Sequence, residues 1–230
     1  MNKFSVKFET TINDFDRFED IKASAILNYF QEIAVRHADN IKLGYNELLK
    51  LDRLWLLCDS KFLILKDIKV NSTINIETWV NKMTSAIYHR HFIIKNVNNE
   101  ILVKGESRWV IIDKNSGTVI RLKEDIYEFV GVNEYSFEEK FCRTVKKDGK
   151  YLGEYSIGYD DIDKYFHMNN VKYVELVYKF IGKKMNSCLV SYYKQVFFKD
   201  KLSLYLNTDN KSTIMGYNQN GEFCFGVEFD

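Results

Sequence analysis

The chain has 230 residues, of which 46% are hydrophobic, 15% aromatic and 28% charged, with no proline; this composition excludes disordered, collagen-like and coiled-coil chains. Lys and Arg number 33 against 32 Asp and Glu, which argues against a nucleic-acid binder that depends on a broad positive field. We find no signal peptide and no apolar stretch long enough to cross a bilayer, so the sequence predicts a cytoplasmic protein without a membrane span.

The first half of the chain predicts one helix followed by a run of strands. A strand is expected over 4–10, and a polar loop rich in acids follows it. Apolar residues at helical spacing predict an amphipathic helix over 23–37, with a short helical segment over 44–51. Strands with turns between them are then expected over 54–65, 72–80, 85–95 and 101–113. This order predicts an α+β fold in which the helix lies on or inside a curved antiparallel sheet.

The second half repeats this order after a charged stretch of weak periodicity. A strand is expected over 151–158, a helix over 171–181, and strands over 189–198, 202–208, 212–218 and 223–229. The D-x-D segments Asp14–Asp16 and Asp161–Asp163 are 147 residues apart and hold the same place before each helix. We therefore predict a duplication: an N-terminal module over 1–125, a connector over 126–150 and a C-terminal module over 151–230.

The densest polar cluster lies just before the second helix and contains Asp163, His167, Asn169 and Asn170. Either asparagine is a good N-cap, so the cluster is expected where free backbone N–H groups and the positive end of the helix dipole meet. Such a place can stabilise an oxyanion, while a carboxylate orients a water and a neutral histidine moves protons near pH 7. An ordinary capped loop is the alternative on chemistry alone.

The segment from Asp161 to Tyr173 resembles the D-x-D-x-N-x-H-V-N-N-x-x-Y segment of acyl-acyl carrier protein thioesterases. The first half is similar to the same family around Asn28–His37, Leu54–Leu57, Ile76–Trp79 and Ser107–Asp113. The resemblance implies a tandem, or double, hot-dog fold, in which each module is a long helix wrapped by an antiparallel sheet. It also implies hydrolysis of the thioester between a fatty acyl chain and the phosphopantetheine arm of acyl carrier protein, with no cofactor and no metal.

By the same resemblance, Asp163 and His167 take the positions of the catalytic Asp and His, and the second module carries the one active site, because Asp20 stands at the equivalent place in the first. Two positions depart from the family. Tyr165 replaces an Asn. Where a Glu is usual, the chain offers Gln195 or, by a shift of one residue, Val196; a Gln can position a water but cannot accept its proton. Asn169 or Asn170 is expected to supply the missing amide.

Several alternatives stay open. A non-catalytic acyl-thioester binding protein, an acyl-CoA thioesterase and a dehydratase would use the same scaffold, and the sequence leaves a homodimer open. Glu175 is a second candidate acid on the helix, and His89 with His91 is a weak candidate metal pair because no acid or Cys partner has a diagnostic spacing. A basic stretch over 140–150 is either a solvated connector or a contact for an acidic carrier protein.

Overall fold

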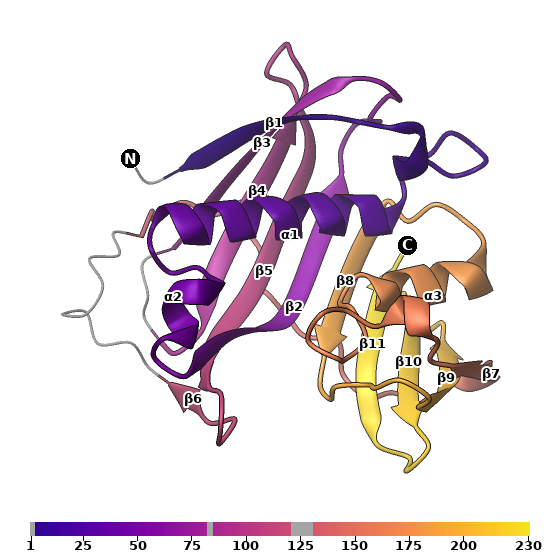
Figure 1. The fold of residues 1–230 in the computed structure, drawn as a ribbon. Helices are drawn as coiled ribbons and strands as arrows, with labels where there is room; N and C mark the ends of the chain where they lie inside the picture. The colour runs from indigo at the N-terminus through magenta and orange to yellow at the C-terminus, as the bar shows by residue number, and fades with distance from the viewer. Residues whose placement is uncertain (1–2, 82–84, 121–130) are drawn as a thin grey trace. The chain divides into compact units, whose positions relative to one another are not determined.

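The computed structural model describes residues 3–81, 85–120 and 131–230, and it divides the chain into two compact units (Figure 1). The first unit comprises Met1–Ile21 and Ala25–Lys140, and the second comprises Lys22–Ser24 and Phe141–Asp230. Of the connector expected over 126–150, residues 126–130 lie outside the described residues, residues 131–140 group with the first unit and residues 141–150 with the second.

The first unit is an antiparallel sheet with one long helix. Its strands run in the order β1-β3-β4-β5-β2, and β6 pairs with β5. The helix α1 covers Ala23–Asn40 and the short helix α2 covers Tyr45–Leu49, as predicted within three residues at each end. The strands are β1 (Phe4–Glu9), β2 (Arg53–Ile64), β3 (Thr73–Val80), β4 (Tyr88–Lys95), β5 (Ile101–Asp113) and β6 (Val119–Ile120).

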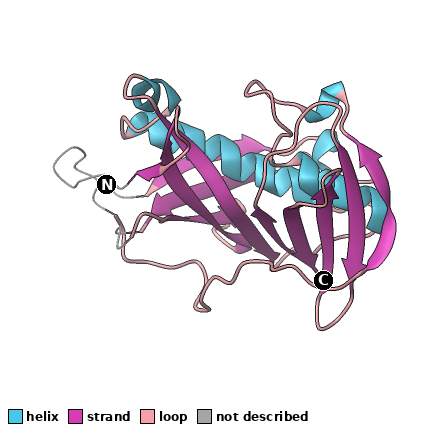
Figure 2. Ribbon diagram, turned by 90° about the horizontal axis from the view of Figure 1, so that it is seen from below, coloured by secondary structure: helices cyan, strands magenta, loops and turns pink. Residues whose placement is uncertain are grey.

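A close approach of helix and sheet sets the core of this unit. Figure 2 shows α1 lying across the strands. Phe30 of α1 stacks on Phe92 of β4, with ring centroids 4.2 Å apart, and covers Gly105 of β5. A Cβ atom at Gly105 would lie only 2.1 Å from the Phe30 ring, so only glycine lets the helix lie this near the strand.

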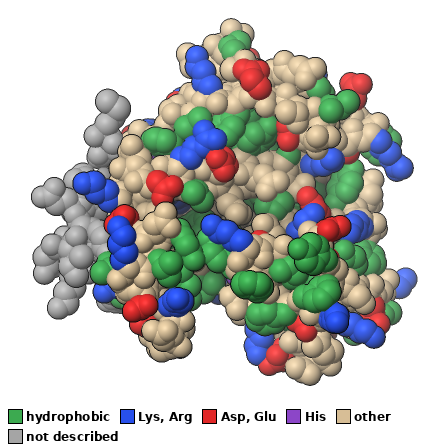
Figure 3. Space-filling view, viewed as in Figure 1, with side chains coloured by type: hydrophobic (Ala, Val, Ile, Leu, Met, Phe, Trp, Pro, Cys, Tyr) green, Lys and Arg blue, Asp and Glu red, His purple; other side chains and the backbone are tan. Residues whose placement is uncertain are grey.

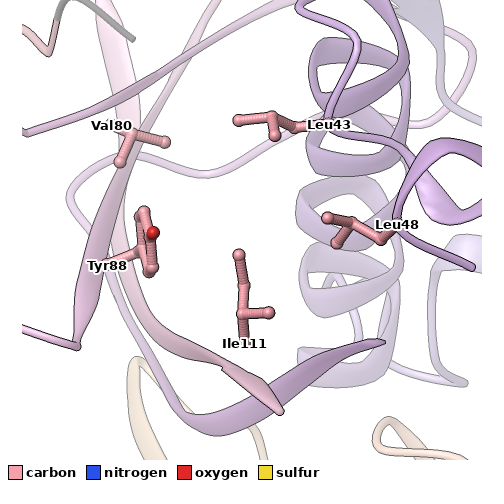
Figure 4. Packing of buried hydrophobic residues seen from close by; sticks show 5 residues of the cluster. All are labelled: Leu43, Leu48, Val80, Tyr88 and Ile111. Atoms are coloured by element: carbon pink, nitrogen blue, oxygen red, sulfur yellow. The ribbon is translucent and has the colours of Figure 1, made fainter. Parts of the chain in front are cut away.

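A second part of this core lies where α1 ends and α2 begins. Its members are a buried residue of the connection between the helices, one of α2 and one from each of three strands: Leu43, Leu48, Val80, Tyr88 and Ile111 (Figure 4). The indole N–H of Trp55 donates to the backbone carbonyl of Leu43, 2.8 Å away, and so ties β2 to the end of α1.

The core of the first unit also contains a buried basic pair. His37 on α1 and Arg90 on β4 are 4% and 6% exposed, and the Arg90 guanidinium lies 2.8 Å from His37 Nδ1. Burial, and then the charge of Arg90, lower the pKa of His37 to about 4, and burial lowers the pKa of Arg90 to about 9. His37 is therefore neutral at pH 7 and accepts a hydrogen bond from a charged Arg90.

The second unit repeats the plan with a shorter helix. Its strands run in the order β8-β11-β10-β9-β7. The helix α3 covers Lys172–Ile181, and its Tyr173 packs edge-on against Phe225 of the sheet, with ring centroids 4.9 Å apart. The strands are β7 (Lys150–Ser156), β8 (Ser187–Tyr192), β9 (Lys201–Asn207), β10 (Ser212–Asn218) and β11 (Phe223–Phe229).

One strand is shorter than the prediction. The apolar run over 189–198 predicts one strand, but β8 ends at Tyr192. The backbone N–H groups of Tyr193 and Lys194 both donate to the carbonyl of Cys224, so the regular ladder stops there. Val196 and Phe197 then pair with Met168 and His167 instead. The prediction of a strand over 193–198 is wrong, and the misassigned segment adjoins the polar cluster.

Candidate active site

A tight turn in the second unit holds the polar cluster. The Asp163 N–H donates to the carbonyl of His167 (3.0 Å), and the Phe166 N–H donates to the carbonyl of Asp163 (3.0 Å). Asp163 Oδ1 accepts the N–H of Tyr165 at 2.8 Å, and Phe166 takes a left-handed φ of 68°. Side chain and backbone of Asp163 therefore both fix the turn, and they bring its ends together.

Three of the predicted site residues meet on this turn. His167 Nδ1 lies 3.9 Å from Asp163 Oδ1, and the two side chains are 22% and 17% exposed. The Tyr165 ring is nearly parallel to the His167 ring, at 21° with 6.1 Å between centroids. A carboxylate and an imidazole at this distance, partly open to solvent, can share one water or one reacting group.

A neighbouring segment supports the turn. The Met168 N–H donates to the carbonyl of Val196 at 2.7 Å, and His167 forms an antiparallel bridge with Phe197. The Val196 N–H in turn donates to the Tyr173 hydroxyl, which comes from α3. His167 therefore sits on a backbone held from two sides, which restricts the orientations of its ring.

Asn169 and Gln195 lie on the segments next to this turn. The N-cap of α3 is Val171, so neither Asn169 nor Asn170 caps the helix as predicted. Asn169 instead closes the turn before it, because its Oδ1 accepts the N–H of Val171 and its carbonyl accepts the N–H of Lys172. Gln195 is exposed on the segment after β8, and among the described residues it makes no hydrogen bond to Asp163 or His167.

A buried carboxylate that was not among the predicted site residues also supports the cluster. Asp161 is 7% exposed and accepts the Tyr155 hydroxyl (3.0 Å) and the N–H of Gly158 (2.9 Å). Its backbone carbonyl accepts the N–H of Asn169. The sequence signal for Asp161 is the D-x-D spacing, which places Asp161 and Asp163 on either side of Ile162, the bridge partner of Met168.

The first unit contains the same turn 147 residues earlier. The Asp16 N–H donates to the carbonyl of Asp20 (2.9 Å), the Glu19 N–H donates to the carbonyl of Asp16 (3.1 Å), and Asp16 Oδ1 accepts the N–H of Phe18 (2.8 Å). Glu19 has a φ of 64°, matching Phe166. The backbone of the duplicated turn is thus reproduced, and Asp20 stands where the second unit has His167.

A cavity of about 390 Å³ adjoins this first-unit turn, between residues 18–21 and residues 67–70. Its lining carries the carboxylates of Glu19, Asp20 and Asp67 and the amine of Lys69, without a histidine. The hollow thus lacks the proton-transferring group that the equivalent turn has in the second unit.

The other candidates are structural. His89 Nδ1 lies 2.9 Å from Glu106 Oε1, and His91 is fully buried with its Nδ1 2.8 Å from the Ser136 hydroxyl, so the two histidines have different partners. Among the described residues no three His, Cys, Asp or Glu side chains lie close enough together to hold a metal ion. Glu175 binds Lys172 on the same helix at 2.8 Å and is not near His167 in the hydrogen-bond network.

No helix in the described part of the chain is long and apolar enough to cross a membrane.

Two family models match the sequence: the acyl-ACP thioesterase N-terminal domain over residues 1–130 and the acyl-ACP thioesterase C-terminal domain over residues 145–220. Among curated proteins, the chloroplastic palmitoyl-acyl carrier protein thioesterase of Cuphea hookeriana is 23% identical over 65% of this chain and 40% of its own length. The chloroplastic oleoyl-acyl carrier protein thioesterase of Coriandrum sativum is 24% identical over 80% of this chain and 54% of its own length.

The matched part of the chain thus spans about half the length of these relatives or less. Solved structures agree on the fold. An acyl-ACP thioesterase from Bacteroides thetaiotaomicron superposes with a TM-score of 0.89 at 16% identity, covering 99% of this chain and 96% of that one. The 12:0-ACP thioesterase from Umbellularia californica gives 0.84 at 15% identity, with the same coverage of both chains. The fold is therefore the α+β double hot-dog fold, and the chain belongs to the acyl-ACP thioesterase family.

Proposed function

We propose that this protein hydrolyses the thioester that joins a fatty acyl chain to the phosphopantetheine arm of acyl carrier protein, and releases the free fatty acid. The observation that carries the proposal is the pairing of His167 and Asp163 across 3.9 Å on a turn fixed by backbone hydrogen bonds, in a chain of this family. A cytoplasmic location stays a prediction from the sequence.

The proposed reaction uses one water and these two side chains. His167 takes a proton from the water as its oxygen attacks the thioester carbon, and the Asp163 carboxylate stabilises the imidazolium that forms. The carbon–sulfur bond then breaks, and His167 returns the proton to the leaving thiolate. The products are a carboxylic acid and a free thiol, so protons and electrons balance without a further reactant.

Three further residues have supporting roles in the proposal. Tyr165 packs flat beside His167 and limits how its ring turns. Asn169 stands beside the start of α3, and its amide N–H₂ is the candidate donor to the oxyanion. Gln195, exposed on the adjoining segment, is expected to orient water rather than to accept its proton.

The test is release of free thiol from acyl carrier protein and acyl-CoA substrates, with the acid product identified by mass spectrometry. His167→Ala and Asp163→Asn should each lower kcat by about 100-fold or more, because each removes a proton-transferring or charge-stabilising group. Asn is preferred to Ala at position 163, since its amide oxygen can still accept the N–H of Tyr165 and keep the turn.

The first unit supplies matched controls. Asp16→Asn and Asp20→Ala change the equivalent positions of an equivalent turn, and both variants should keep kcat within about twofold. Undiminished turnover in His167→Ala, or equal losses in the Asp16 and Asp163 variants, would contradict the assignment.

The second candidate is a protein that binds the acyl thioester without cleaving it. Gln195 in place of a carboxylate, together with Tyr165 in place of an amide, favours this alternative. Saturable binding of an acyl thioester with no thiol released over hours would identify it. A dehydratase would instead remove water from a 3-hydroxyacyl substrate and leave the thioester intact.

A further inference from the structure

Exposed aromatic side chains lie on the segments that carry and support the candidate catalytic histidine. We name four of them the aromatic collar: Tyr159, Phe166, Phe197 and Phe198. Tyr159 and Phe166 are 84% and 82% exposed, and the two other rings are about half exposed. Large apolar side chains that gather around a site, instead of being scattered singly, mark an interaction surface.

The collar comes from three short segments that backbone hydrogen bonds join. Phe166 directly precedes His167, and Phe197 is its bridge partner. The Ile157 N–H donates to the carbonyl of Asp200 (2.9 Å), and the Lys199 N–H donates to the carbonyl of Ile157 (3.1 Å), which ties the turn after Phe198 to the segment before Tyr159. These rings are therefore presented on a fixed platform, which lowers the entropy lost when a partner binds.

Phe166 is not needed to form its turn. A bulky residue at a φ of 68° is strained, and backbone strain gathers where function requires it. The first-unit turn has the same hydrogen bonds and the same left-handed residue with Glu19 at this position. Because a polar residue serves the turn equally well, the exposed ring of Phe166 needs an explanation outside the fold.

Lysines accompany the rings. Lys164 Nζ lies 4.9 Å from the centroid of the Tyr165 ring, and Lys199 Nζ lies 5.3 Å from that of Phe198. The Asp200 carboxylate is directed to its own turn, where it accepts the N–H of Phe197 and the Gln219 amide. Figure 3 shows hydrophobic side chains over the second unit, with Lys and Arg as well as Asp and Glu side chains among them. Such a surface suits a partner with apolar and anionic groups.

We propose that the aromatic collar, with Lys164 and Lys199, is the docking surface for the acyl carrier protein, and that the lysines meet the phosphate of its arm or the acidic surface around it. This inference rests on the proposed function, because it assumes that the thioester reaches His167 while attached to the carrier. Two collar residues adjoin His167: Phe166 precedes it in the chain, and Phe197 is its bridge partner. A carrier docked there delivers its arm to the site, whereas a membrane or a second copy of this chain would cover the loop that the substrate must reach.

The test compares two substrates that differ only in the carrier. Phe166→Glu, which copies the first-unit residue, and Phe198→Ser should each raise KM for an acyl-carrier-protein substrate about tenfold or more, since exposed aromatic anchors dominate docking energy. KM and kcat for the matching acyl-pantetheine thioester should stay within about twofold. Phe18→Ser removes the exposed ring from the equivalent turn of the first unit. This variant should change neither KM nor kcat for either substrate.

Each other outcome overturns the inference. Equal changes for both substrates would show that the collar shapes the reaction site itself. Co-sedimentation with phosphatidylglycerol vesicles that Phe166→Glu abolishes, with KM for the carrier substrate unchanged, would assign the collar to a lipid surface. A dimer that the same variant dissociates, again with KM unchanged, would assign it to a second copy of the chain.

The proposed function can fail separately. If the wild-type protein releases thiol from no substrate, docking is measured by fluorescence anisotropy with a labelled carrier protein that bears an amide-linked acyl chain. Weaker binding to Phe166→Glu than to Phe18→Ser would support the collar without catalysis. Equal binding to the two variants would overturn it.

Discussion

At the scale of single residues, Tyr165, whose ring lies beside that of His167, is the main departure from the family pattern. Tyr165 stands where the family has an amide, and its parallel contact with His167 suggests that it acts by packing. Tyr165→Phe keeps the ring and is expected to keep kcat within about twofold, whereas Tyr165→Leu should lower kcat by about 2- to 10-fold, the value of one aromatic contact. Single-turnover thiol release measures the effect, and an equal loss in both variants would assign the role to the hydroxyl.

A second residue-scale prediction concerns Gly105. In Gly105→Ala the new methyl group meets the Phe30 ring, which is 2% exposed and stacked on Phe92, so the ring has little room to move. We expect a loss of about 1–3 kcal/mol in the free energy of unfolding, measured with urea. Adding Phe30→Leu should recover part of this loss. Gly158→Ala is the control, since its Cβ would meet no atom nearer than 3.6 Å.

At the scale of elements, the turns offer a test that separates stability from activity. Phe166→Asn replaces a bulky left-handed residue with one that tolerates this backbone, and should raise the free energy of unfolding by about 0.5–1 kcal/mol. The urea midpoint measures the gain, and Glu19→Asn in the first unit is the matched comparison. A destabilised Phe166→Asn protein would show that the ring packs within the fold.

The elements also show what a sequence can and cannot reveal. Period-2 and period-3.6 patterns located the helices and most strands, because each has one face in a core, as with Ile74 and Ile76 of β3. The end of β8 at Tyr192 was missed, since Val196 is as apolar as a strand residue but pairs with Met168. That pairing joins segments far apart in the chain, and no local pattern contains it.

The same limit applies to the site. The resemblance named Asp163 and His167, and the structure places them on one turn. The N-cap prediction, which came from residue preference alone, was wrong, because an asparagine before a helix has two local uses, and Asn169 closes a turn rather than capping α3. The sequence contains no pattern that predicts the aromatic collar, since the exposure of the Phe166 side chain depends on the folded turn.

At the scale of the whole molecule, buried histidines predict sensitivity to acid. Burial lowers the pKa of both His37 and His91 to about 4, below the ordinary value of 6.5. Between pH 6.5 and 4 the unfolded chain binds protons at these positions and the folded chain does not, so stability falls as pH falls through this window. The neighbouring groups are Arg90 at His37, and Glu106, His89 and Lys61 at His91.

The measurement is urea unfolding at pH 7, 5.5 and 4.5. The free energy of unfolding should decrease steadily, and His37→Gln should flatten the decrease, because one of the two proton-binding positions is gone. An unchanged slope in this variant would contradict the buried, neutral state of His37. Circular dichroism at pH 7 serves as the control that the variant has folded.

The repeated turn has a consequence for how such proteins change. Its hydrogen bonds come from the backbone and from one aspartate in each copy, so the side chains two, three and four positions after that aspartate make none of them. One copy reads Phe-Glu-Asp there and the other reads Tyr-Phe-His. The three side chains can therefore differ between copies, with or without a histidine, while the backbone of the turn keeps the same conformation.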